Sequence, residues 1–317
     1  MTETQKSPRI LILGAGAIGA FYGLALAEAG AEVSVVVRSE YDIVKANGYA
    51  LNSQQRGDKV FRPAQVLSSV EQYQGGSPDY LVVTLKVIDG LDRVSLMRSA
   101  VGPQTVIVLI ENGVEIEDEI AQAFPDNELI SCLAFIQVSR IAPGVIIHYA
   151  FDALTMGNFP QGVSNKCKQF SSMLISSQVG APLTENVVSA RWQKCLWNAP
   201  FNPVSVLGGP IDTIKMLNAP SGEQLIRDLM REVALVASAT GNPVPEGLID
   251  TYISSTKKAP PYKTSMALDW ERGDPMEVTV ILDNTLAAAK RVGVVTPCLQ
   301  TVTTLIKMLQ LKKSEEK

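Results

Sequence analysis

The chain has 317 residues, a formal net charge of −4 and a pI of about 5.3. This length is enough for two domains with sizeable cores, and the acidic balance argues against nucleic acid or acidic lipid as a partner. The four cysteines lie far apart, and His148 is the only histidine. The sequence therefore excludes a His-rich metal cluster, predicts no metal site, and fits reduced thiols in a cytoplasmic protein.

The most informative pattern opens the chain. A short apolar strand at residues 10–13 leads into Gly14, Gly16 and Gly19, spaced G-x-G-x-x-G, and a helix of small residues follows. In dinucleotide-binding folds the first glycine makes the tight turn, the second admits the pyrophosphate, and the third lets the helix pack on the strand. We therefore predict that the turn and the helix N-terminus bind a dinucleotide, the alternative being a plain structural turn. The predicted binding residues are Gly14, Gly16, Ala17, Ile18 and Gly19.

The same region has a second interpretation that must be set aside. Residues 10–27 carry no charge and could pass for a signal or membrane segment. The glycine spacing and the strand-helix-strand rhythm favour a nucleotide-binding unit, so we expect no association with a membrane.

The next strand indicates which cofactor is bound. It covers residues 33–37 and ends at Arg38, with no acid at its tip. NAD(H) is usually held at this point by an Asp or Glu on the ribose 2′-OH, whereas a guanidinium can pair with a 2′-phosphate. The pattern favours NADP(H), unless Arg38 merely caps a strand end in solvent.

The first half of the chain alternates short β-rich runs with helical stretches. This alternation predicts a parallel sheet covered by helices on both faces. The expected core strands are residues 10–13, 33–37, 80–85, 106–110 and 129–135. Further strands are expected at the far edge, within residues 49–63, 144–149 and 157–158.

From about Thr184 the pattern changes to amphipathic helices. In the first, residues 223–239, one apolar face is predicted to hold Leu225, Leu229, Val233 and Val236. Two more are expected at residues 275–291 and 299–309. The sequence thus predicts an α/β Rossmann-type domain at residues 1–183 and an all-helical domain at residues 184–317.

Several further motifs occur together and in a fixed order. The run Arg191–Pro203 contains W-x-K-x-x-x-N-x-x-x-N-P, which places Lys194, Asn198 and Asn202 one helical turn apart. The remaining motifs are Leu85-Lys86, Asn112-Gly113, the run Gly144–His148, and Thr264-Ser265-Met266-x-x-Asp269 followed by Glu277. As a set they resemble the ketopantoate reductases (2-dehydropantoate 2-reductases) over nearly the whole chain.

The resemblance implies an enzyme of pantothenate biosynthesis that reduces a small branched 2-keto acid with NADPH. It implies an active site in the cleft between a Rossmann domain and a helical domain. Lys194 would be the general acid, and Glu277 a carboxylate that interacts with the substrate and with the lysine. The other implied roles are substrate binding by Asn198, Asn202 and Ser265, cofactor or substrate binding by Lys86, and a place between nicotinamide and substrate for Asn112.

The chemistry agrees with these roles. Reduction of a 2-keto acid needs a hydride on the carbonyl carbon and a proton on the developing alkoxide. Lys194 can supply that proton if burial lowers its pKa toward neutrality.

Most of these residues also have a structural interpretation. Lys194 could be a solvated surface lysine, and Asn112 with its following glycine is a common turn dipeptide. Glu277 could close a capping box with Pro275 at the first helical position. Ser265 and Lys86 could be plain loop residues.

His148 lies in an apolar, strand-like stretch. We interpret it as a structural histidine whose ring nitrogens are satisfied, and as the backup proton donor if Lys194 proves inert.

The chain departs from the family pattern on the substrate side. Pro200 stands between the two asparagines, Glu111 replaces a glutamine or histidine, and the residues after Glu277 differ. Other 2-keto acids therefore remain candidate substrates. Two other functions also remain open, a noncatalytic NADP(H)-binding regulator and a related 2-hydroxy acid dehydrogenase. The sequence leaves open whether the chain forms a homodimer.

Overall fold

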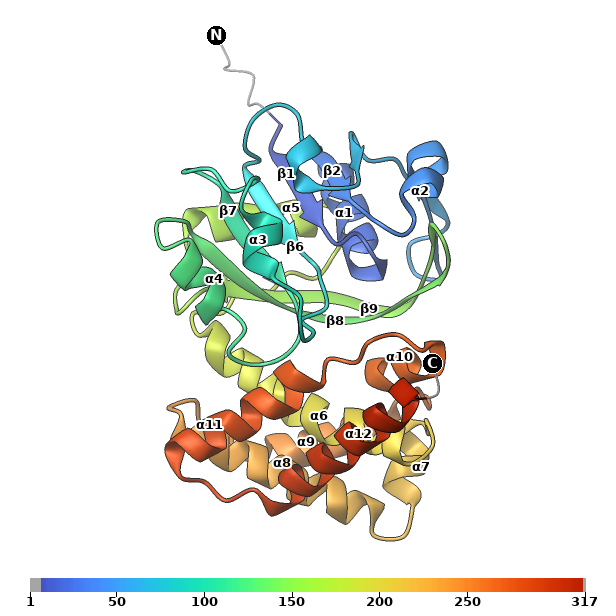
Figure 1. The fold of residues 1–317 in the computed structure, drawn as a ribbon, viewed down its shortest axis with the longest axis vertical. Helices are drawn as coiled ribbons and strands as arrows, with labels where there is room; N and C mark the ends of the chain where they lie inside the picture. The colour runs from blue at the N-terminus through green and yellow to red at the C-terminus, as the bar shows by residue number, and fades with distance from the viewer. Residues whose placement is uncertain (1–6, 316–317) are drawn as a thin grey trace. The chain divides into compact units, whose positions relative to one another are not determined.

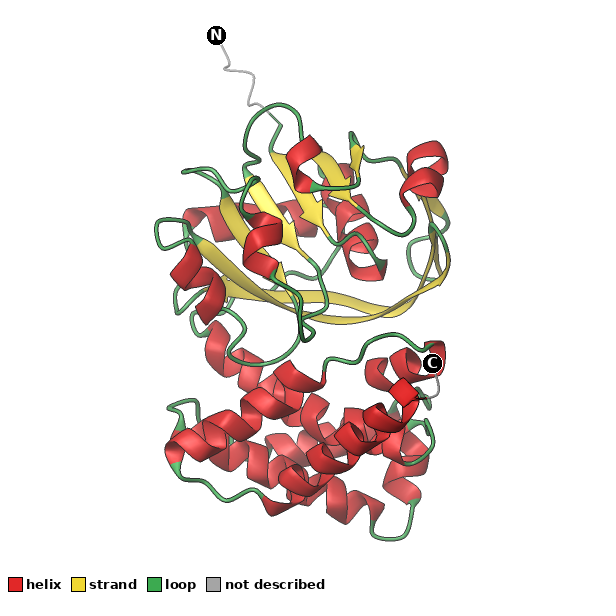
Figure 2. Ribbon diagram, viewed as in Figure 1, coloured by secondary structure: helices red, strands yellow, loops and turns green. Residues whose placement is uncertain are grey.

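The computed structural model describes residues 7–315, which divide into two compact units. The first contains the described residues up to Lys86, together with Leu91–Glu111 and Glu117–Val187. The second contains Val87–Gly90, Asn112–Ile116 and the described residues from Val188 onward. Two short excursions from the N-terminal half therefore belong to the second unit, and one of them carries Asn112. Figure 2 shows the sheet in the first unit and helices in the second.

The first unit is built on a nine-stranded sheet in the order β4-β3-β9-β8-β7-β6-β1-β2-β5. All neighbouring strands are parallel except the pairs β3–β4 and β8–β9, which are antiparallel. The strands are β1 Arg9–Leu13, β2 Glu32–Val36, β3 Tyr49–Ser53, β4 Lys59–Phe61, β5 Val66–Leu67, β6 Tyr80–Val83, β7 Val106–Ile110, β8 Leu129–Ala142 and β9 Val145–Asn158.

Helices cover both faces of this sheet, as predicted (Figure 1). Alternate residues of the buried strands face opposite sides, so Ile10 and Ile12 pack with α1 and α5 while Leu11 and Leu13 pack with α3 and α4. The helices of this unit are α1 Ala17–Glu28, α2 Tyr41–Asn47, α3 Arg93–Met97, α4 Asp118–Ala123 and α5 Asn165–Ser176, with a short 3-10 turn at Val70–Gln72.

The strand order reverses between β1 and β6, which are neighbours in the sheet although four strands separate them in the sequence. In doubly wound sheets, ligands bind beyond the carboxyl ends of the strands at such a reversal. The glycine turn follows β1, and Thr84 and Leu85 follow β6, so both segments lie at this point.

One edge-strand prediction is wrong. Residues 157–158 do not form a separate late strand but are the end of β9, which pairs with β8 along its length. The connection between β8 and β9 is tight, with Gly144 at φ +70°. This turn lets two long strands run as one antiparallel ribbon.

The second unit is entirely helical among the residues that the structure describes. Its elements are α6 Val187–Leu207 (Val187 itself belongs to the first unit), α7 Thr213–Asn218, α8 Gly222–Ala239, α9 Leu248–Lys258, α10 Ser265–Arg272, the π-helical segment η2 Thr279–Asp283, α11 Asn284–Val292 and α12 Pro297–Glu315.

Two details of the predicted helices need correction. On α8 the buried face begins with Ile226, whereas Leu225 is 38% exposed. Leu225 is about 40° from Leu229 around the helix, so it lies at the edge of the buried stripe, in the first turn of the helix. The helix expected at residues 275–291 begins only at Val278.

Candidate active site

Each glycine of the N-terminal turn is required for a different structural reason. Gly14 has φ +93°, and a Cβ there would lie 2.6 Å from Leu85 Cδ2. A Cβ on Gly19 would lie 2.7 Å from Thr84 Oγ1 and 3.1 Å from Ile12 Cγ2. A Cβ on Gly16 would meet only the Gly14 carbonyl oxygen, at 4.0 Å, and would otherwise point into open space. The first glycine permits the turn, the third permits close helix packing, and the second leaves room for a ligand.

The first turn of α1 is suited to an anion. The helix begins at Ala17, with Gly16 as its N-cap residue and no acidic side chain in its first turn. The backbone N–H groups of a first helical turn have no partner within the helix, and the helix dipole is positive there. The N–H groups of Ala17, Ile18 and Gly19 therefore offer a place for phosphate oxygens.

Two side chains that the sequence did not single out hold this turn in place. Thr84 Oγ1 donates a hydrogen bond to the Gly14 carbonyl at 2.7 Å. The buried Tyr49 hydroxyl donates to the Ala15 carbonyl at 2.6 Å. Thr84 directly precedes the Leu85-Lys86 motif, which is a usable signal, whereas nothing in the local sequence around Tyr49 points to the turn.

Arg38 lies two residues beyond the end of β2, and its side chain is exposed. The next carboxylate along the chain, Glu40, is buried and already used, because it pairs with Arg140 and accepts the Gly144 N–H at 2.7 Å. Glu40 is thus unavailable to a ribose 2′-OH. Lys86 follows β6 and is half-buried.

In the second unit, three predicted residues form one hydrogen-bonded cluster. The Lys194 ammonium donates to Asn112 Oδ1 at 2.9 Å, and Asn112 Nδ2 donates to Glu277 Oε2 at 2.9 Å. The other carboxylate oxygen of Glu277 accepts the Val87 N–H at 3.3 Å. The Asn112 amide therefore bridges a cation and an anion with each end in its proper role.

The surroundings of Lys194 make it a stronger acid than an ordinary lysine. Burial lowers the pKa of Lys194 to about 8, and the nearby Arg191 guanidinium also lowers it, while the Glu277 carboxylate acts in the opposite direction. At neutral pH the amine is still mostly protonated, so it can donate a proton and does so more readily than a solvated lysine.

The capping-box interpretation of Glu277 is wrong. Helical structure begins at Val278, and Pro275 lies in an irregular segment before it. The Asp274 N–H, which a capping box would direct to Glu277, donates to the Asp269 carbonyl at 2.9 Å. The Glu277 carboxylate is instead held by the cluster and is only 8% exposed with the rest of its side chain.

The predicted substrate-binding asparagines lie on α6 with Lys194. Spacings of four residues put Lys194, Asn198 and Asn202 on one side of this helix, which continues through Pro200 as far as Leu207. Asn202 is 1% exposed, and neither its Nδ2 nor its Oδ1 has a hydrogen-bond partner among the described residues. An unsatisfied buried amide costs roughly 1–3 kcal/mol, so the Asn202 side chain lacks the partners that a buried amide normally has.

Ser265 is the exposed first residue of α10. The cap of this helix is formed by the preceding Thr264, whose Oγ1 accepts the Ala267 N–H at 3.2 Å. The Ser265 hydroxyl is therefore not needed to begin the helix.

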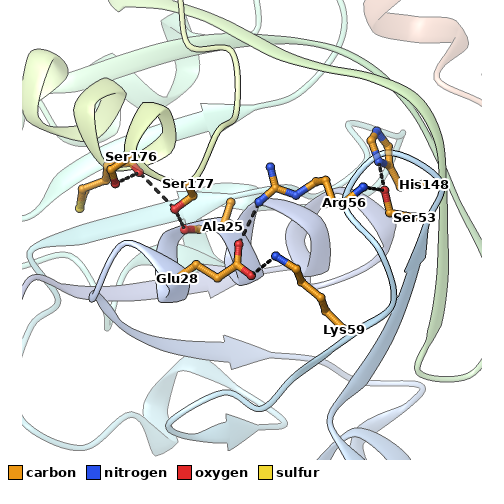
Figure 3. A network of polar contacts seen from close by, with 9 residues as sticks. Ala25, Glu28, Ser53, Arg56, Lys59, His148, Ser176 and Ser177 are labelled. Carbon is orange, nitrogen blue, oxygen red and sulfur yellow. Dashed lines mark hydrogen bonds and ion pairs between the residues drawn. The ribbon is translucent and has the colours of Figure 1, made fainter.

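His148 belongs to the interior of the first unit, where Figure 3 shows it beside Ser53. Its Nδ1 lies 2.8 Å from Ser53 Oγ, and its Nε2 contacts the Phe151 carbonyl. Ser53 Oγ also accepts the Arg56 N–H at 3.0 Å, and the Arg56 side chain turns away to pair with Glu28 (Figure 3). Both ring nitrogens have partners, which agrees with a structural histidine.

Two kinds of feature are absent from the described residues. Between residues 7 and 315, no helix has the length and apolar character needed to cross a membrane. Within the same range, no group of three or more His, Cys, Asp or Glu side chains is arranged to hold a metal ion.

Comparisons with known proteins agree with this geometry. The family model "Ketopantoate reductase PanE/ApbA" matches residues 10–161, and the model of its C-terminal part matches residues 186–310. A 2-dehydropantoate 2-reductase of Nostoc sp. is 31% identical over 291 residues, which are 90% of each chain. The crystal structure of 2-dehydropantoate 2-reductase from Methylococcus capsulatus is 49% identical with a TM-score of 0.91, and the match covers 96% of this chain and 98% of that one.

A more distant structure shares the fold alone. D-mandelate dehydrogenase, solved with NADH and anilino(oxo)acetate, has a TM-score of 0.86 at 19% identity, over 95% of this chain and 97% of that one.

The fold, the glycine turn and these matches define an oxidoreductase. The chain belongs to the ketopantoate reductase PanE/ApbA family. The family resemblance and the fold class predicted from the sequence are both confirmed.

Proposed function

We propose that this chain reduces a small branched 2-keto acid with NADPH, that 2-dehydropantoate is its first candidate substrate, and that Lys194 supplies the proton. The observation that carries the proposal is the Asn112–Lys194–Glu277 cluster, in which the pKa of Lys194 is lowered to about 8. A general acid works best when its pKa lies near the operating pH. A protein that only binds a dinucleotide has no need of such a group.

Residues of the first unit would hold the cofactor. The open space at Gly16 and the first turn of α1 suit a pyrophosphate, and the exposed Arg38 suits a 2′-phosphate because Glu40 is already paired. Lys86 is proposed as a further positive contact to cofactor or substrate. When bound, the nicotinamide supplies the hydride that the carbonyl carbon accepts.

Residues of the second unit would handle the substrate. The Lys194 ammonium gives its proton to the carbonyl oxygen as charge develops there, and Asn112 Oδ1 fixes the direction of the ammonium. The Glu277 carboxylate favours the charged form of the amine and contacts the substrate. Asn198, Asn202 and Ser265 are proposed to bind the polar groups of the hydroxy acid, and the unsatisfied amide of Asn202 supports this role.

The test is a panel of 2-keto acids, including 2-dehydropantoate, mixed with enzyme and NADPH while the absorbance of NADPH is followed. We expect turnover on a branched 2-keto acid with NADPH and little turnover with NADH. Tight NADPH binding without turnover on any acid would indicate a noncatalytic binding protein. Faster reduction of NADP⁺ by hydroxy acids than oxidation of NADPH by keto acids would indicate a dehydrogenase that acts oxidatively.

A further inference from the structure

A second cation lies next to Lys194 on the same helix. Arg191 precedes Lys194 by three residues on α6, so the two side chains leave the helix on one side. Arg191 is only 2% exposed, which is unusual for a residue of this type. Its Nη1 donates a hydrogen bond to the Gly113 carbonyl at 3.2 Å. Arg191 thus holds the carbonyl group of the residue that directly follows Asn112.

The segment that carries Asn112 is tightly held within the second unit. The Val114 N–H donates to the Val280 carbonyl at 3.1 Å, and Asn284 Nδ2 donates to the Val114 carbonyl at 2.8 Å. Gly113 has φ +97°, and a Cβ there would lie 2.5 Å from the Cβ of Val280. Among these contacts, the one from Arg191 is made to Gly113 itself, immediately beside Asn112. It therefore helps to fix the backbone position from which the Asn112 amide reaches Lys194.

The charge of Arg191 also acts on Lys194. A guanidinium stays protonated at any pH that proteins tolerate, so Arg191 opposes a second positive charge beside it. The charged group on the other side of the cluster is Glu277, which favours that charge, and Asn112 between them is neutral. Of these two influences, that of Arg191 is the larger, and it lowers the pKa of Lys194.

We propose that Arg191 is a positioning residue for the reduction, which fixes the Asn112 turn through the Gly113 carbonyl and poises the Lys194 ammonium to release its proton. The proposal rests on the proposed function of Lys194 as the general acid. It assigns Arg191 no contact with substrate or cofactor.

The test compares Arg191→Met, which removes the charge at similar length, with Arg191→Lys, which keeps the charge. Arg231→Met is the matched control, because Arg231 lies in the same unit with 54% of its side chain exposed. Lysines are dimethylated reductively with ¹³C, and the Lys194 resonance is identified by its loss in Lys194→Met. The pH titration of that resonance is followed in each variant, and kcat/KM for keto acid reduction is measured across the same pH range.

In Arg191→Met we expect the Lys194 resonance to titrate at higher pH, and kcat/KM at pH 7 to fall by about tenfold. In Arg191→Lys we expect the wild-type titration with a smaller loss of activity, because the shorter ammonium no longer makes the planar contact with the carbonyl. Arg231→Met should match the wild type.

An unchanged titration in folded Arg191→Met overturns the proposal, and so does an equal upward shift in the Met and Lys variants. If the Met variant fails to fold, the Lys variant decides, because a titration that departs from wild type there contradicts a role for the charge. The NMR titration needs no turnover. If no keto acid is reduced, the proposed function fails, while the effect of Arg191 on Lys194 is still measured.

Discussion

The glycine turn of the first unit and the Lys194 cluster of the second are built in different ways. The turn depends on backbone conformation. Gly14, Gly16 and Gly19 act through the absence of a side chain, and all three lie within a stretch of six residues. The cluster depends on side chains that converge from distant parts of the chain. Its Asn112–Glu277 hydrogen bond joins residues 165 positions apart. A site made by local backbone conformation can be derived from spacing alone, whereas a site made by converging side chains depends on the whole fold of its unit.

The largest expected effect on activity comes from the Lys194 cluster. Lys194→Ala should lower kcat for keto acid reduction by roughly 10²–10⁴-fold, because it removes the proton donor. The Kd of NADPH, measured by fluorescence quenching, should stay within a factor of about three, because this residue lies outside the glycine turn. Lys215→Ala is the control, since this lysine is 73% exposed in the same unit. Wild-type turnover in Lys194→Ala would reject Lys194 as the acid.

The choice of cofactor should depend on the first unit alone. Arg38→Ala is expected to weaken NADPH binding by about 10- to 100-fold, because it removes a charge-assisted contact to the 2′-phosphate. NADH binding should change little, and it serves as the internal control in the same titration calorimetry. Equal losses for both cofactors would mean that Arg38 does not contact the 2′-phosphate.

The glycines of the turn should respond differently to substitution, because each is required for a different structural reason. Gly16→Ala places a methyl group in open space, so we expect an unchanged melting temperature but roughly tenfold weaker NADPH binding, since the methyl fills room needed by the ligand. Gly19→Ala forces a methyl against Ile12 and Thr84, so it should destabilise the fold by about 1–3 kcal/mol. Thermal melts and binding isotherms of both variants check this. Equal melting losses would contradict the distinction.

The smallest effect concerns the support of the turn. Tyr49→Phe removes the buried hydrogen bond to the Ala15 carbonyl and should cost about 1 kcal/mol of unfolding free energy. Urea denaturation measures it, with Tyr41→Phe as the control, because the Tyr41 hydroxyl accepts a hydrogen bond from the exposed Lys45. A loss no larger than that of the control would show that the Tyr49 hydroxyl adds nothing to stability.

The sequence predicted much of the fold because its signals are local. Apolar runs marked the core strands, and helical periodicity marked the second unit. The errors arose where local rules gave way to tertiary context. Leu225 satisfied the apolar spacing, but Ile226 faces the core. The run from Asp274 to Glu277 matched a capping box, but the Glu277 carboxylate is held by Asn112 and Val87 instead.

The site was only partly accessible from the sequence. Lys194, Asn112 and Glu277 came from a family resemblance, and spacing could not show that one asparagine bridges the other two. Arg191 stood within a quoted motif but had no assigned role, since its contact with Gly113 joins residues 78 positions apart. Tyr49 was missed for the same reason, because it contacts Ala15, which is 34 positions away, whereas Thr84 directly precedes the Leu85-Lys86 motif and had a usable signal.

The pH dependence of kcat/KM for keto acid reduction at saturating NADPH tests the role of Lys194 most directly. Because only the protonated amine can donate, and its pKa is lowered to about 8, activity should fall as the pH rises through about 8. That alkaline limb should be absent from the residual activity of Lys194→Ala. A wild-type profile that stays level well above pH 8, or the same limb in both proteins, would contradict the account.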